Sequence, residues 1–85
     1  MEELTIKKYN NNHTYFIIYG CYSADSNIAK KLNISLNKYK KILLKNGAFY
    51  RYEKEIPYLD FKTKQDALNA IEDLTPYLIM KKLTE

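Results

Sequence analysis

The segment Asn27–Ala48, NIAKKLNISLNKYKKILLKNGA, decides how this chain folds. Its second half carries apolar residues at the spacing of one face of an α-helix. Ser35 stands where a hydroxyl caps the start of such a helix, and Asn46–Gly47 is a common helix end. The segment therefore predicts a helix over residues 36–45. The residues of its apolar face are Leu36, Tyr39, Ile42 and Leu43.

A shorter helix is predicted just before it, capped by either Ser23 or Asp25. Asn33 ends this helix, because Asn is among the few residues other than glycine that adopt the left-handed conformation of a tight turn. The two helices and their turn occupy residues 24–47. The apolar positions of the first helix are Ile28, Ala29 and Leu32.

This pair resembles the helix-turn-helix of DNA-binding proteins. That motif has a small residue inside its first helix, here Ala29, and an apolar residue after the turn, here Ile34. Tyr39 and Ile42 correspond to the residues that lock the second helix across the first, and Asn33 stands where glycine is usual. The same pattern is shared by other tight helical hairpins, so a purely structural helix pair is the alternative.

The resemblance implies that the second helix enters the major groove of duplex DNA, with its N-terminal residues leading. Asn37 would then contact an adenine edge, and the lysines would mostly contact phosphate. If the pair instead packs on a sheet as plain structure, its lysines are simply solvated. The residues implied to face DNA are Ser35, Asn37, Lys38 and Lys41, with further charge from Lys30, Lys31, Lys40 and Lys45.

The positive charge of the chain is concentrated on this pair. The formal net charge is +4, whereas residues 23–52 carry six Lys and one Arg against one Asp, a local excess of +6. Clustering of this kind is typical of a surface that binds a polyanion. A solvated lysine-rich face has the same composition, so both interpretations stay open.

Segments with strand character flank the pair on both sides. Residues 4–9 and 14–19 are joined by a short polar connection and predict one β-hairpin. Residues 48–52 and 56–61 predict a second hairpin. Either the two hairpins pair into one four-stranded sheet, or the second hairpin is the wing of a winged helix-turn-helix.

A last helix is predicted from the Thr-x-x-Asp start at Thr63. We expect it to break at Pro76, since the residue before a proline resists helical geometry. The order of elements predicts one α+β domain over residues 1–85. In this fold a small antiparallel sheet of two β-hairpins is combined with the helix pair and the broken C-terminal helix.

Tyrosine is unusually frequent, with nine Tyr beside three Phe and no Trp. Tyr50, Tyr52 and Tyr58 lie on the second predicted hairpin. An exposed row of tyrosines stacks on bases or anchors a protein partner, which makes these three candidates for aromatic contact. The alternative is that they pack beneath helices, with their hydroxyls at the rim.

The stretch after Pro76 is apolar nearly all round. That is more apolar surface than one packing face needs in so small a domain. Tyr77, Leu78 and Met80 are therefore candidate contacts of a homodimer formed through the C-terminal helix.

Enzyme chemistry is not expected from this composition. One His and one Cys make no metal-binding cluster, and two glycines do not form a phosphate-binding loop. We expect no catalytic residue, no metal and no cofactor. The longest apolar run, Tyr15–Tyr19, is too short to cross a membrane, and the acidic start is not that of a signal peptide. The expected location is the cytoplasm of a bacterial host cell.

The layout of the whole chain resembles small uncharacterised phage and prophage proteins of low-GC Gram-positive bacteria. The shared features are the helix pair ending in Asn46-Gly47-Ala48 and the segment 61–74, FKTKQDALNAIEDL. Such proteins are often regulators, or inhibitors of host machinery that includes defence nucleases. The resemblance itself implies no particular activity, and the helix-turn-helix motif together with the clustered positive charge favours a DNA-binding regulator first. The alternative is a non-enzymatic, anti-CRISPR-like inhibitor that contacts a host protein such as a CRISPR nuclease.

Overall fold

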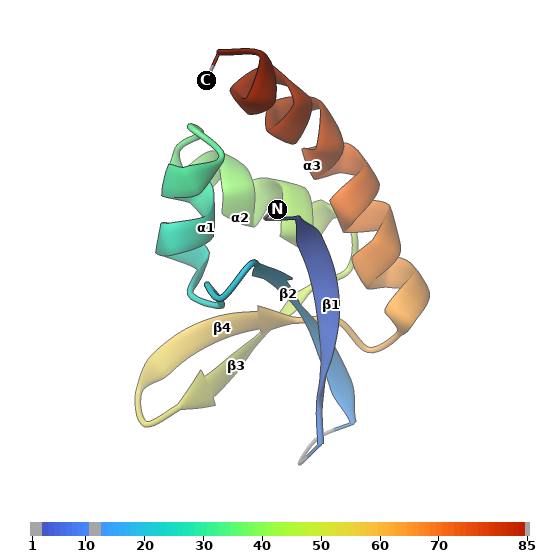
Figure 1. Ribbon diagram of the computed structural model, residues 1–85. Coiled ribbons are helices and arrows are strands. Elements are labelled where there is room, and N and C mark those ends of the chain that lie inside the picture. The colour runs from blue at the N-terminus through green and yellow to red at the C-terminus, as the bar shows by residue number, and fades with distance from the viewer. Residues whose placement is uncertain (1–2, 11–12, 85) are drawn as a thin grey trace.

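The computed structural model describes residues 3–10 and 13–84. Two antiparallel hairpins and three helices make up an α+β fold, so the predicted class is confirmed. Figure 1 shows the helices gathered over the hairpins, with the second hairpin projecting to one side. The elements in chain order are β1 (Leu4–Tyr9), β2 (Thr14–Tyr19), α1 (Asp25–Lys31), α2 (Leu36–Lys45), β3 (Phe49–Glu53), β4 (Ile56–Asp60) and α3 (Lys64–Thr84).

The two hairpins form two small sheets rather than one four-stranded sheet. Among the described residues they meet at one antiparallel bridge just after β4, where the Tyr15 N–H donates to the Phe61 carbonyl at 2.9 Å and the Phe61 N–H donates to the Tyr15 carbonyl at 2.7 Å. Beyond this bridge, β3 and β4 diverge from the first hairpin (Figure 1).

The core lies between the helices and the hairpins. β2 contributes Ile17 and Tyr19, and α3 covers both β1 and β2. Of the apolar residues predicted for the helix pair, all but two are buried in the core: Ile42 is only partly buried and packs against it, and Leu36 is exposed. The other buried core side chains include Ile28, Ala29, Leu32, Tyr39, Leu43, Leu59, Phe61, Ala67, Ala70 and Leu74.

The turn between α1 and α2 has the predicted geometry. Asn33 takes a left-handed φ of 60°, and the Ile34 N–H donates to the Ala29 carbonyl at 3.1 Å. Ser35 caps α2, because its hydroxyl accepts the Lys38 N–H at 3.1 Å. These contacts are all local, which is why the residue order alone predicts them.

The predicted cap of α1 is wrong. Ala24 occupies the cap position without a side-chain hydrogen bond, and Asp25 is the first helical residue. The far end of the pair is fixed to the last helix instead, because the Asn46 side-chain amide donates to the Ile42 carbonyl at 2.8 Å and to Asp73 at 2.9 Å.

The predicted break at Pro76 needs correction, because α3 runs through this residue as one helix of 21 residues. A proline removes one backbone donor, a loss that packing on both sides of it can offset. Leu74 and Leu78 are buried on either side, and the Thr75 hydroxyl donates to the Ile71 carbonyl at 2.7 Å. Burial of the helix therefore overrides the local preference.

Candidate nucleic-acid interface

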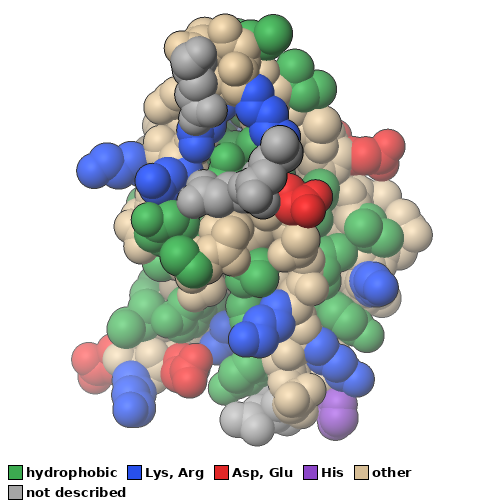
Figure 2. Space-filling view, viewed as in Figure 1, with side chains coloured by type: hydrophobic (Ala, Val, Ile, Leu, Met, Phe, Trp, Pro, Cys, Tyr) green, Lys and Arg blue, Asp and Glu red, His purple; other side chains and the backbone are tan. Residues whose placement is uncertain are grey.

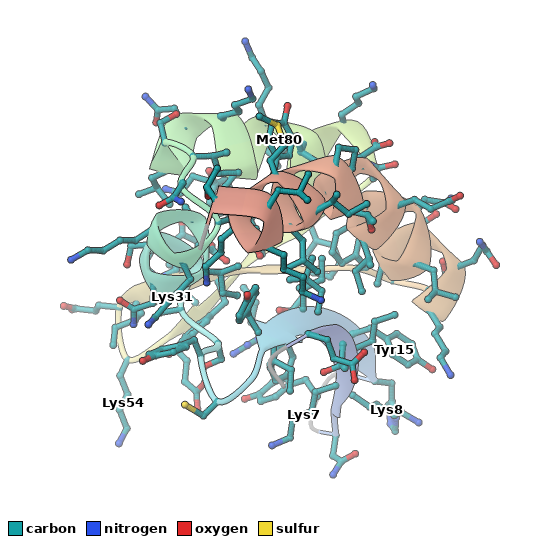
Figure 3. All side chains as sticks on the ribbon, turned by 45° about the horizontal axis from the view of Figure 1, so that its top comes forward. Lys7, Lys8, Tyr15, Lys31, Lys54 and Met80 are labelled. Carbon is teal, nitrogen blue, oxygen red and sulfur yellow. The ribbon has the colours of Figure 1, made fainter. Side chains whose placement is uncertain are left out.

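The outer side of α2 carries a basic stripe, by which we mean Asn37, Lys41 and Lys45. These residues are four apart, so they lie one above another on a helix, and all three are exposed. No acidic residue occurs within α2. Figure 3 shows side chains that end in nitrogen projecting from α2 away from the hairpins. The stripe is thus a positive ridge with no acidic residue on its own helix.

Lys38 and Lys40 flank the basic stripe rather than belonging to it. The Lys38 ammonium lies over the Tyr77 ring of α3, 4.5 Å from its centroid. Half-buried Lys40 turns to the other side and lies 6.0 Å from the ring centroid of Tyr50 on β3. Cation–π contacts of this kind orient a lysine without neutralising its charge.

The lysines of α1 are not brought into the basic stripe. Lys31 lies over the Tyr22 ring, 5.1 Å from its centroid. Lys30 and Lys31 line a separate hollow of about 500 Å³ together with Asn33 and Lys81. The hydroxyl of Ser35 is engaged in capping α2, so this predicted contact has a structural role first.

The predicted tyrosine contacts divide between the two faces of the second hairpin. Tyr50 and Tyr52 share one face and stack, with ring centroids 6.2 Å apart and an interplanar angle of 26°. Tyr52 is 69% exposed. Tyr58 is half-buried on the opposite face, where its ring lies 4.6 Å from the guanidinium of Arg51. Only the first two are available together on one surface.

The tip of the second hairpin adds little net charge. Glu53, Lys54 and Glu55 follow one another there and are exposed. Figure 2 shows acidic and basic side chains next to each other at this tip, at the lower left. The positive potential beside the hairpin therefore comes from α2.

Arg51 does not contribute to the surface charge, although the sequence count includes it. It is 8% exposed, its Nε donates to Asp60 at 2.7 Å, and its Nη1 donates to Glu53 at 3.0 Å. Asp60 is fully buried and also accepts the Thr14 hydroxyl at 2.6 Å. Sequence analysis missed this group because its members come from three strands.

Asp25 is the second functional candidate that sequence analysis missed. Burial raises the pKa of its carboxyl to about 6 from 3.8, while Lys40 lowers this pKa and Asp60 raises it. The nearby Tyr39 hydroxyl is buried without a hydrogen-bond partner among the described residues, and burial followed by the charge of Asp25 raises its pKa. The available signal was that Asp25 is the single acid between residues 23 and 52.

The candidate dimer contacts are only partly exposed. Leu78 belongs to the core at 9% exposure, so its assignment to a dimer surface is wrong, because this side of α3 faces the hairpins. Tyr77 is half-buried beneath Lys38. Met80 is 63% exposed and projects from α3 away from the hairpins (Figure 3), near exposed Ile79 and Leu83.

Comparison with protein-family models, with curated proteins and with solved structures gives no match. Within residues 3–10 and 13–84, no helix combines the length and the apolar character needed to cross a membrane. The same residues contain no group of three or more His, Cys, Asp or Glu side chains placed to hold a metal ion.

Proposed function

We propose that the chain binds duplex DNA through α2, as a small phage-type regulator. The observation that carries this proposal is the basic stripe of Asn37, Lys41 and Lys45 on the outer side of a capped helix that follows a tight turn. In this role the lysines contact phosphates, which set affinity and register. Asn37 lies nearest the start of α2 and contacts a base edge.

The second hairpin supports this role by its position. Lys40 connects α2 to Tyr50, so the face that carries Tyr50 and Tyr52 adjoins the flank of the recognition helix. Because Arg51 is paired inside the protein, the cations available to DNA are mainly those of α2. About four phosphate contacts are expected, which corresponds to a slope of about −3.6 in a plot of log affinity against log salt.

The test is a fluorescence titration of mixed-sequence duplex DNA at several salt concentrations. Replacing Lys41 and Lys45 together by Glu is expected to abolish measurable binding. The matched control replaces Lys62 and Lys64 by Glu, since these exposed lysines lie outside α2. Equal losses in both variants, or no binding by the natural chain at low salt, would contradict the proposal.

A second candidate function is inhibition of a host protein, such as a defence nuclease, through an acidic patch on that protein. The observation in its favour is that exposed apolar side chains accompany the lysines, namely Leu36, Leu44, Tyr52 and Ile56. Exposed apolar side chains do not contribute to contacts with a phosphate backbone, whereas buried apolar and aromatic side chains supply much of the binding energy in protein interfaces. Replacing Leu44 by Ser should then weaken partner capture and leave DNA affinity unchanged.

A further inference from the structure

The two hairpins and Ser23, just before α1, line a hollow of about 360 Å³. Two cross-strand pairs line it, Lys7 opposite Phe16 and Arg51 opposite Tyr58. In Figure 2 the hairpins diverge at the lower centre and lower left, with basic side chains between them. Sites for small organic ligands start at roughly 300 Å³, so the hollow is large enough for a compact ligand.

Arg51 lies at the base of this hollow in a fixed orientation. Its guanidinium lies 4.0 Å from the ring centroid of Tyr9 and 4.6 Å from that of Tyr58. Among the described residues, its hydrogen bonds to Asp60 and Glu53 start from Nε and Nη1. One N–H of Nη1 and both N–H groups of Nη2 are not used in these bonds, and Arg51 lines the hollow.

The chemistry of the lining favours an anionic ligand with a flat ring. Lys7 and Lys8 are the exposed cations of the lining, since the charge of Arg51 is balanced by Asp60 and Glu53. Phe16 adds a half-buried aromatic wall. A ring against aromatic side chains and an oxyanion on Arg and Lys are complementary to these surfaces.

We propose that this hollow binds a nucleotide, with the phosphate on Lys7 and Arg51 and the base against Phe16. Stacking on aromatic rings beside basic side chains is how proteins hold nucleotides without regard to sequence. Asn10 and Ser23 line the hollow as well and offer polar groups to the edge of the base. The site lies on other elements than the basic stripe and does not depend on the proposed binding of duplex DNA.

The test is a titration of the isotope-labelled full chain followed by NMR, with AMP, adenosine, inorganic phosphate and a short single-stranded DNA as separate ligands. AMP is expected to shift the amide signals around Lys7 and Phe16 and to bind more tightly than adenosine or phosphate alone. If the single-stranded DNA binds more tightly than AMP, the nucleotide that the hollow binds is part of a strand. If the two affinities are equal, the ligand is a free nucleotide.

Two variants locate the ligand. Lys7→Gln should weaken AMP binding roughly three- to tenfold by removing a charge-assisted contact. Phe16→Leu should weaken both AMP and adenosine while the signals of the core stay in place. Lys64→Gln, at an exposed lysine outside both the hollow and the basic stripe, is the control and should change nothing. The proposal is overturned if AMP shifts no signals at millimolar concentration, if phosphate alone binds as tightly as AMP, or if Lys64→Gln weakens binding and Lys7→Gln does not.

Discussion

Arg51 shows how one side chain can join elements that are distant in sequence. It belongs to β3, bonds Asp60 on β4 and packs on Tyr9 and Phe16 of the first hairpin. A buried carboxylate such as Asp60 is costly unless it is paired and hydrogen-bonded, and Arg51 and Thr14 both donate to it. This group therefore links the second hairpin to the first.

Asp25 makes folding stability depend on pH. Because its folded pKa of about 6 exceeds the ordinary value of 3.8, the folded state holds a proton between these pH values that the unfolded state releases. The Asp25 carboxyl therefore destabilises the fold least at low pH, where it is protonated in both states. Its destabilising effect grows as the pH rises from about 4 to about 6. Asp25→Asn should stabilise the chain by about 1 kcal/mol at pH 7.5, after discounting for partial exposure, and by almost nothing at pH 4.

Urea denaturation of the natural chain and the variant at both pH values measures this difference. Asp66→Asn, on the first turn of α3, is a suitable control because it makes the same chemical change on another element. Equal effects of Asp25→Asn at pH 4 and pH 7.5 would show that the carboxyl is not desolvated in the folded protein.

Single residues could be predicted from the sequence where their partners are near in the chain. Asn33 and Ser35 were placed correctly because the turn and the cap involve neighbours a few positions away. Arg51 and Asp25 were not, because burial by distant segments determines their surroundings. The sequence shows that these two groups carry charge, but it does not show which groups share their space.

Among the elements, α3 shows that tertiary packing can override the tendency of a proline to end a helix. Pro76 lacks the amide that would donate within the helix, and its neighbours Leu74 and Leu78 keep the helix in place. Pro76→Ala should therefore stabilise the chain by about 1–2 kcal/mol, less than the full helix penalty because proline also restricts the unfolded chain. Thermal and urea unfolding measure this gain, and a loss of stability would instead show that Pro76 stabilises the folded helix or its packing.

One part of the candidate interface, the basic stripe, could be predicted from the sequence of α2 alone. Helical periodicity places Asn37, Lys41 and Lys45 in one row without knowledge of the fold. The directions of Lys38 and Lys40 depend on Tyr77 and Tyr50, which belong to other elements. The division of the tyrosines followed from strand alternation, once the register of β3 and β4 was known.

For the whole molecule, the exposed apolar end of α3 is the surface that bears on assembly. Ile79, Met80 and Leu83 are exposed near one another, and Leu83 is 80% exposed. We expect the chain to associate with itself at high micromolar concentration, since apolar groups gathered on a surface tend to be covered. Ile79→Lys combined with Leu83→Lys should keep it monomeric.

Light scattering over a concentration series measures this association. Lys substitutions at Gln65 and Glu72, exposed positions nearer the start of α3, control for the added charge. A natural chain that stays monomeric throughout would remove the C-terminal helix as a dimer surface and leave it for another partner.

The placement of α3 also affects how the chain acquires its shape during synthesis. α3 packs on β1, β2 and α2, which are all translated before it, and Leu4, Ile17 and Tyr19 share one cluster with Ala67 and Ala70. Ribosomes add roughly 5–20 residues per second, so only a few seconds pass between the synthesis of the earlier elements and that of α3, which packs on them. In that interval the nascent chain exposes the apolar face of its first hairpin, and it is then that chaperones and proteases have access to it.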